Sequence, residues 1–445
     1  MRSFLFNSKI KIFKILIPYL VKYKAFNFLS VLFILSLSEL KPISPKKKKK
    51  FKIVILSKSA GIDDVIESKK NNNDNILYLA CPRVFIKTIF NTIFNNQEYN
   101  DTKKFFSKKL KSKRNDYKNF LIEFLNVLKN KYSINAFVGF NFEFMEEVEL
   151  AAACQKLKIP FLLLYKESVL TGIEEKYLRH FIKKLGEKFN GYKIAVYSDY
   201  AKKIFIDTNF VNKKNVEVVG CSRLSKSFSF RKKIPKKQIL YYAIEPKRGL
   251  PDPFVAHYGN NFFKDLKDHR QYDPSYNWNF QNTKIIKILR KFAIKNPDAV
   301  VIIKIKTGQL PNAKQYLNLP NNIRLQYFGV GHQLLEKSKV VIAWNTTAIL
   351  EGIAANRFIL LPYFHKKDNN FRKQNELKLK LRNENYGYSE YDFYKKLLSF
   401  IKKKYNKNKI YNNQYSLKYH LNNADNKASL RLNKFFSKNV TIKKF

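Results

Sequence analysis

Two neighbouring strand-like runs in the second half of the chain end in side chains that could hold a phosphate. Residues 299–308 read AVVIIKIKTG, so Lys304 and Lys306 lie two apart and share one face of the predicted strand. Three polar residues interrupt a second apolar run, residues 340–344, before a predicted helix: Asn345, Thr346 and Thr347. The free N–H groups and the dipole of a helix N-terminus favour an anion. Together the two runs predict a diphosphate site.

A carboxylate and a histidine extend this set toward the rest of a nucleotide. Glu351 follows Thr347 by about one helical turn, so its carboxylate could accept hydrogen bonds from a ribose hydroxyl pair. His332 lies at a further strand end. Each residue also has a structural alternative: Thr346 or Thr347 as a helix N-cap, Glu351 as a solvated acid, and the lysines as surface residues. Their coincidence at neighbouring strand ends favours the phosphate site.

The strands that carry these side chains belong to a repeating pattern. Across residues 51–230 apolar runs alternate with helical patterns, and this order restarts after a basic linker at residues 233–238. Unalternated apolar strands between helices predict a parallel sheet covered on both faces. The sequence therefore predicts an α/β protein with two doubly wound, Rossmann-like domains that face a cleft, at residues 46–230 and 231–405.

Two segments flank these domains. Residues 1–45 are apolar and basic, and their longest uncharged run, residues 25–38, is shorter than the roughly 20 residues that a membrane-spanning helix needs. We expect helices that either pack on the first domain or lie at a membrane surface, with these lysines facing anionic head groups: Lys9, Lys11, Lys14, Lys22 and Lys24. Residues 406–445 form a tail with a predicted last helix.

The chain is strongly basic, since 86 Lys+Arg against 34 Asp+Glu give a formal net charge of +52. Such a charge can indicate nucleic acid or anionic lipid as a partner. The excess is mostly lysine, however, and comes with abundant Asn, Ile, Phe and Tyr, all of which have A/T-rich codons. Codon bias therefore accounts for most of it. The lysines are spread along the chain without a nucleic-acid-binding motif, so nucleic acid is not the expected partner.

Cysteine and histidine spacing predicts neither disulfides nor a metal site. Cys81, Cys154 and Cys221 lie far apart, and the 6 histidines form no HxH or HxxxH pair. Such cysteine usage fits a reducing compartment. We expect a cytoplasmic protein, either free or peripheral at the inner membrane face, that uses no metal or cofactor.

Four segments resemble glycosyltransferases of the GT-B superfamily. Residues 338–364, SKVVIAWNTTAILEGIAANRFILLPYF, look like the donor-site segment of a strand, a polar turn, a helix with an early Glu, and a strand ended by Pro. AVVIIKIKTG is similar to the preceding family strand, which ends in Lys-Pro-His-Pro. VEVVGCSRLSKSF, residues 216–228, resembles the Gly-Ser-Pro-Arg segment that closes the first domain. Residues 136–168 look like bacterial surface-carbohydrate (capsule-type) biosynthesis proteins.

This resemblance implies a nucleotide-sugar donor bound by the second domain, without a metal, and a glycan or lipid-linked acceptor on the first. The base that deprotonates the acceptor would then project from a strand end of the first domain. Asp63, Glu143 and Glu167 are the candidates, with Asp64 beside the first. Glu167 is favoured, because it follows a fully apolar strand where burial would raise its pKa, although Lys166 would oppose that shift.

The sequence also departs from the family, which leaves other functions open. The histidine of Lys-Pro-His-Pro is absent, and Cys221 and Ser222 stand where the family has Ser-Pro. A polyol-phosphate (glycerophosphate-type) transferase and a sugar-nucleotide 2-epimerase share the fold or the C-terminal motif. A non-catalytic glycan-binding protein is the alternative of another class.

Overall fold

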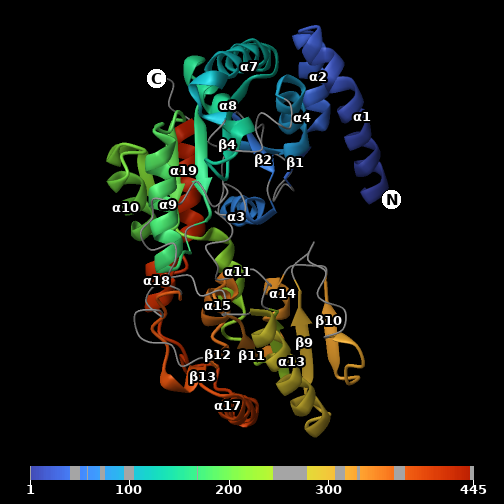
Figure 1. Cartoon of the computed structure of the whole chain (residues 1–445), viewed down its shortest axis with the longest axis vertical. Coiled ribbons are helices and arrows are strands. Elements are labelled where there is room, and N and C mark those ends of the chain that lie inside the picture. Colours follow the sequence, from blue (N-terminus) through green and yellow to red (C-terminus); the bar gives the residue numbers. More distant parts are fainter. Residues whose placement is uncertain are drawn as a thin grey trace.

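A computed structural model describes ten stretches of the chain, and these form two parallel-sheet domains that lie end to end along the long axis (Figure 1). The described residues are 2–40, 51–57, 59–70, 76–94, 105–167, 169–243, 278–305, 316–327, 331–364 and 376–440. The predicted α/β architecture of two doubly wound domains is confirmed.

The first domain is built on a 7-stranded sheet in the order β1-β3-β2-β4-β5-β6-β7. Its strands are β1 (Ser38–Glu39), β2 (Phe51–Ser57), β3 (Ile76–Pro82), β4 (Ile134–Gly139), β5 (Phe161–Tyr165), β6 (Lys193–Val196) and β7 (Val216–Val218). Only β1 is antiparallel to its neighbour. The sheet is covered by α3 (Ser59–Lys69), α4 (Arg83–Ile93), α7 (Lys111–Tyr132), α8 (Met145–Lys156), α9 (Gly172–Leu185) and α10 (Asp199–Asp207). Buried on both faces, its central strands read as apolar runs.

The second domain has a 6-stranded sheet in the order β10-β9-β8-β11-β12-β13, all parallel. Its strands are β8 (Gln238–Tyr242), β9 (Val300–Lys304), β10 (Ile323–Gln326), β11 (Ser338–Ile342), β12 (Phe358–Pro362) and β13 (Tyr386–Gly387). Its helices are α13 (Trp278–Lys295), α14 (Gly331–Leu334), α15 (Thr347–Ala354) and α17 (Glu390–Lys402). This is the Rossmann strand order, which reverses between β8 and β11. Ligands of such sheets bind at the carboxyl ends of the strands at this switch point.

The N-terminal extension is helical and packs on the first domain. Helices α1 (Arg2–Lys22) and α2 (Phe26–Ser36) lie side by side at its outer edge (Figure 1). The buried face of this pair contacts α4 and α7: the Phe33 ring packs edge-on against Phe85 and Phe124, with centroids 5.1 and 5.6 Å apart. Among the described helices, none is long and apolar enough to cross a membrane.

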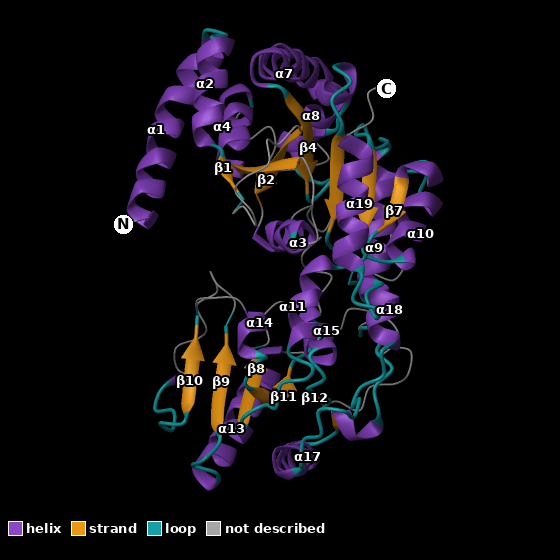
Figure 2. Ribbon diagram, turned by 180° about the vertical axis from the view of Figure 1, so that it is seen from behind, coloured by secondary structure: helices purple, strands orange, loops and turns teal. Residues whose placement is uncertain are grey.

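The C-terminal tail returns to the first domain. After α18 (Tyr415–Leu421), helix α19 (Ala428–Val440) lies among the elements of the first domain (Figure 2), where the Phe436 ring packs against Tyr78. The Cys221 N–H donates to the Leu421 carbonyl at 3.0 Å. At Gly220, with φ +81°, a Cβ would meet the Asn422 carbonyl at 2.8 Å, so glycine is required where the tail crosses. The last helix of the predicted tail, α19, is therefore packed in the first domain, whereas the start of the tail packs on the second domain, where the Tyr411 N–H donates to Asn356 Oδ1 at 2.9 Å.

Lys306, one of the predicted phosphate ligands, lies outside the described residues.

Candidate active site

The polar turn after β11 is at the switch point of the second sheet. Thr346 is the N-cap of α15, and its Oγ1 accepts from the Ala348 N–H at 3.4 Å. Asn345 has φ +40°, a left-handed conformation that asparagine tolerates, and its Oδ1 accepts from the Leu377 N–H. Thr347 is the first residue of the helix. The N-cap alternative therefore holds for Thr346, and the turn directs the helix N-terminus at the carboxyl edge of the sheet.

Lys304 ends β9 with its ammonium group turned inward. Only 8% of the residue is exposed, and its Nζ donates to the Ile305 carbonyl at 2.6 Å and to the Tyr327 carbonyl at 3.3 Å. Burial lowers the pKa of this amine. Among the described residues no carboxylate pairs with it, and its acceptors there are these two neutral carbonyls at the carboxyl edge of the sheet. Two strand spacings, roughly 10 Å, separate β9 from β11.

Tyr242 ends β8, the strand between these two features, and the sequence did not indicate it. It ends β8 in register with Lys304, so their side chains share a face of the sheet. The hydroxyl is buried and has no hydrogen-bond partner in the described structure. A Cβ at Gly331 would meet this hydroxyl at 3.0 Å, which explains the glycine at the start of α14. Burial, with the charge of Glu351, raises the Tyr242 pKa well above its usual value, so it is a neutral donor.

Glu351 and His332 face the first domain. Burial raises the pKa of Glu351, Arg223 and Lys226 lower it, and Asp63 and Asp64 raise it further. Burial likewise lowers the pKa of His332, and Lys226 adds to that shift. His332 is therefore neutral at pH 7, and Glu351 lies between Tyr242 of its own domain and the charged residues of the other.

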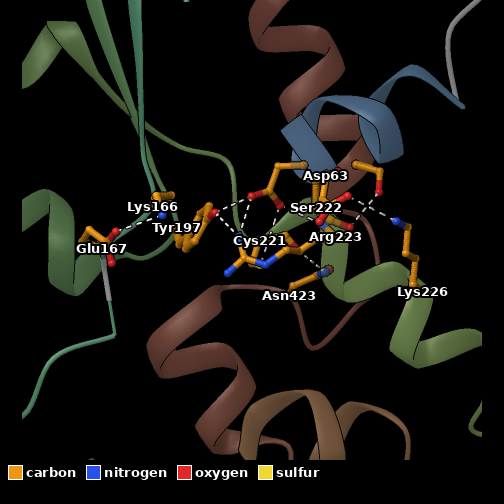
Figure 3. Close-up of polar contacts among 11 residues, drawn as sticks. Asp63, Lys166, Glu167, Tyr197, Cys221, Ser222, Arg223, Lys226 and Asn423 are labelled. Carbon is orange, nitrogen blue, oxygen red and sulfur yellow. Dashed lines mark hydrogen bonds and ion pairs between the residues drawn. The ribbon is translucent and has the colours of Figure 1, made fainter. Parts of the chain in front are cut away.

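Those charged residues are organised around one buried ion pair. Asp64 of α3 is fully buried and accepts from the backbone N–H of Arg223 at 2.7 Å and from its Nη1 at 2.8 Å. The Tyr197 hydroxyl also donates to Asp64, and Arg223 Nη1 contacts that hydroxyl at 2.8 Å. Figure 3 shows Tyr197, Cys221 and Arg223 gathered at this point. With all of its partners inside the protein, Asp64 is a structural residue rather than a free base.

Asp63, next to it in sequence, points elsewhere. Its carboxylate is 27% exposed and lies 3.7 Å from the Lys226 ammonium, which is also 3.6 Å from Glu67 (Figure 3). The charge of Asp63 acts on both His332 and Glu351. Of the three predicted catalytic residues, Asp63 is thus the one that faces the switch-point residues of the second domain.

Glu143 and Glu167 both lie near the buried Tyr165. Burial and the charges of these two residues raise the pKa of Tyr165. Half of the Glu167 side chain is exposed, and its carboxylate pairs with Lys166 at 3.0 Å (Figure 3). The burial that was expected to raise the pKa of Glu167 is missing, because the chain has already turned out of the sheet when it reaches this residue.

No group of three or more His, Cys, Asp or Glu side chains in the described part of the chain is placed to hold a metal ion. The described residues supply the following cations and hydrogen-bond donors near the switch point: Lys304, Lys226, the Tyr242 hydroxyl and the N-terminus of α15.

Comparisons with known proteins find likenesses of structure alone. No family model and no curated protein matches the sequence. A Listeria monocytogenes protein described as a UDP-N-acetylglucosamine 2-epimerase aligns over 89% of this chain and 98% of its own, with 9% identity and a TM-score of 0.49. The Neisseria meningitidis UDP-GlcNAc 2-epimerase bound to UDP-GlcNAc aligns over 88% of this chain and 98% of its own, with 12% identity and a TM-score of 0.45. The wall teichoic acid polymerase TagF aligns over 95% of each chain, with 11% identity and a TM-score of 0.46. These identities and scores are too low to assign an activity.

The ion pair makes a contrast between adjacent residues testable. Asp64→Ala leaves the Arg223 guanidinium buried and unpaired, which should lower the free energy of unfolding by about 3–5 kcal/mol. Asp63→Ala removes only a longer, partly exposed pair and should cost less than about 1 kcal/mol. Urea denaturation of both variants measures the difference, and equal losses would contradict the structural role given to Asp64.

Proposed function

We propose that this chain is a metal-independent glycosyltransferase of surface-polysaccharide synthesis, which transfers a sugar from a nucleotide-sugar donor to a glycan or lipid-linked acceptor. The donor diphosphate would lie across the carboxyl ends of β9, β8 and β11. Lys304, the Tyr242 hydroxyl and the N-terminus of α15 would bind it, with Glu351 accepting from the ribose.

One observation carries this proposal: at the switch point of a Rossmann-ordered sheet, the strand that ends in Tyr242 lies between the strand that ends in the buried Lys304 and the strand that leads to the N-terminus of α15. Among the described residues, the buried Tyr242 hydroxyl has no hydrogen-bond partner and Lys304 has no carboxylate partner. An unsatisfied buried donor is costly, by about 1–3 kcal/mol. A phosphate oxygen would satisfy Tyr242 and at the same time neutralise Lys304. The structural alternative, a capped helix next to surface lysines, leaves the buried hydroxyl without an explanation.

The same groups suit the chemistry of glycosyl transfer. The bond between the anomeric carbon and the diphosphate oxygen breaks, the diphosphate leaves with the electron pair, and the acceptor oxygen forms the new bond. Charge therefore grows on the leaving diphosphate, where Lys304 and the α15 N-terminus would stabilise it in place before the reaction. The acceptor proton passes to a base of the first domain. We assign that role to Asp63, which faces Glu351 and His332 across the domains.

Donor binding is tested with two lysines of equal burial. Lys304 and Lys339 are each 8% exposed and donate to backbone carbonyls, but Lys339 lies at the opposite, amino end of β11. Lys304→Met should weaken nucleotide-sugar binding about 10- to 100-fold, as expected for one charge-assisted hydrogen bond, and Lys339→Met should not. Calorimetry or thermal shift with UDP-, GDP-, CMP- and CDP-linked sugars and CDP-glycerol measures this.

The outcomes of that panel separate the candidate functions. Stabilisation by CDP-glycerol alone would favour the polyol-phosphate transferase, and stabilisation by no compound, with both variants folded, would reject the donor site. A 2-epimerase would convert its nucleotide sugar without any acceptor, which a coupled product assay detects.

The base is tested by comparing the three candidate carboxylates in turnover. Asp63→Asn should lower kcat by about 100-fold or more while leaving donor affinity unchanged, because a general base acts on the acceptor in the transition state. Glu143→Gln and Glu167→Gln should retain activity. A loss confined to Glu167→Gln would transfer the role of base to that residue.

We also propose that the α1–α2 hairpin contacts an anionic membrane surface. Its outer face carries large apolar side chains that are 44–72% exposed: Ile12, Ile15, Leu16, Tyr19, Tyr23, Phe28, Val31 and Leu35. The first acidic residue of the chain is Glu39, whereas Arg2 and five lysines precede it. Exposed apolar side chains at helical spacing, with basic residues in the same helices, are typical of helices that lie in the membrane interface.

Vesicle flotation tests this contact with a matched control. Leu16→Glu with Phe28→Glu should reduce binding to vesicles that contain phosphatidylglycerol by at least about tenfold, since each apolar side chain contributes about 1.5–3 kcal/mol when buried. Ile234→Glu with Leu317→Glu changes two exposed apolar residues of the second domain, 71% and 58% exposed, and should have no effect. Equal flotation of the two double variants would reject the hairpin as the membrane contact.

A further inference from the structure

A cavity lies behind the exposed face of the hairpin. It encloses about 790 Å³ between the turn that joins α1 to α2 and the helices α4 and α7. This volume falls within the roughly 300–1,000 Å³ of small-molecule sites. Most of the wall is apolar, from Pro18, Val21, Phe26, Ile93, Phe120 and Ile122. Such a wall suits a hydrocarbon chain.

Charged side chains of both signs line the same cavity. Lys22 and Lys24 belong to the hairpin, and Asp116 and Glu123 belong to α7. All four are exposed, and none forms an ion pair within the described structure. Two cations on one side and two anions on the other match a ligand that itself carries one charge of each sign next to an apolar part.

Tyr19 connects the cavity to the membrane face. This residue lines the cavity and is also 63% exposed on the outer face of the hairpin. A molecule in the cavity can therefore be continuous with the bilayer on which the hairpin rests. A soluble nucleotide fits poorly, because the wall is apolar and the two carboxylates repel a polyanion.

We propose that this cavity binds one aminophospholipid of the membrane. Its acyl chain fills the apolar part, Lys22 and Lys24 bind its phosphate, and Asp116 and Glu123 bind its ammonium group. The proposal rests on the membrane contact proposed above and adds selectivity for the head group to it. A purely anionic head group would satisfy the lysines but would face the two carboxylates of α7.

Short-chain lipids test the cavity apart from the membrane. Monomeric dihexanoyl phosphatidylethanolamine should bind the full chain more tightly than dihexanoyl phosphatidylglycerol in calorimetry. Asp116→Asn with Glu123→Gln should weaken the binding of phosphatidylethanolamine by roughly tenfold without weakening that of phosphatidylglycerol. Lys22→Gln with Lys24→Gln should weaken both. As a control, Asp298→Asn with Glu384→Gln, carboxylates of the second domain, should change neither.

Failure of this proposal is distinguishable from failure of the membrane contact. If neither short-chain lipid binds, or if both bind equally and Asp116→Asn with Glu123→Gln has no effect, the cavity is not a lipid site, even when vesicles still float the protein. If phosphatidylethanolamine binds selectively but flotation does not depend on Leu16 and Phe28, the lipid site in the cavity is supported and the hairpin is rejected as the membrane contact.

Discussion

The buried ion pair between Asp64 and Arg223 is the constraint on which the rest of the structure depends. It joins residues 159 positions apart: the first turns of α3 and the turn where the first domain ends. Because separating the two charges would leave each of them unpaired, this ion pair holds α3 against the turn that follows β7. Tyr197, at the end of β6, contacts Arg223 through its hydroxyl. The C-terminal tail contacts the same region, because the Cys221 N–H donates to the Leu421 carbonyl.

The second domain faces this ion pair with the switch point of its own sheet. Glu351 is the residue where the two sides come together, because its pKa depends on Arg223 and Asp64 across the domains, while its own charge acts on Tyr242. If the second domain binds the donor as proposed, a change in the distance between the domains would alter the pKa of Glu351 and, through its charge, the pKa of Tyr242.

The sequence was sufficient for the elements and insufficient for their side-chain partners. Most strands were predicted from continuous apolar runs, because a strand that is buried on both faces is apolar at successive positions. The same logic could not find Tyr242, because a tyrosine at the end of an apolar strand reads as core until its hydroxyl is seen to lack a partner. It overestimated the burial of Glu167, because no local signal marks where a chain leaves the sheet. The partners of Asp64 lie too far along the chain for any pattern.

The lysines show why position has to outweigh composition in this chain. Lys304 and Lys339 have the same exposure, donate to the same kind of acceptor and have their pKa lowered by the same burial. A census of charge, or of buried charge, treats them alike. Only the strand order separates them, since Lys304 ends its strand beside the reversal between β8 and β11 and Lys339 begins its strand at the far edge. In a chain with a formal charge of +52, a lysine therefore indicates a binding site only where it lies at the carboxyl ends of the strands near the switch point, the place where such sheets bind ligands.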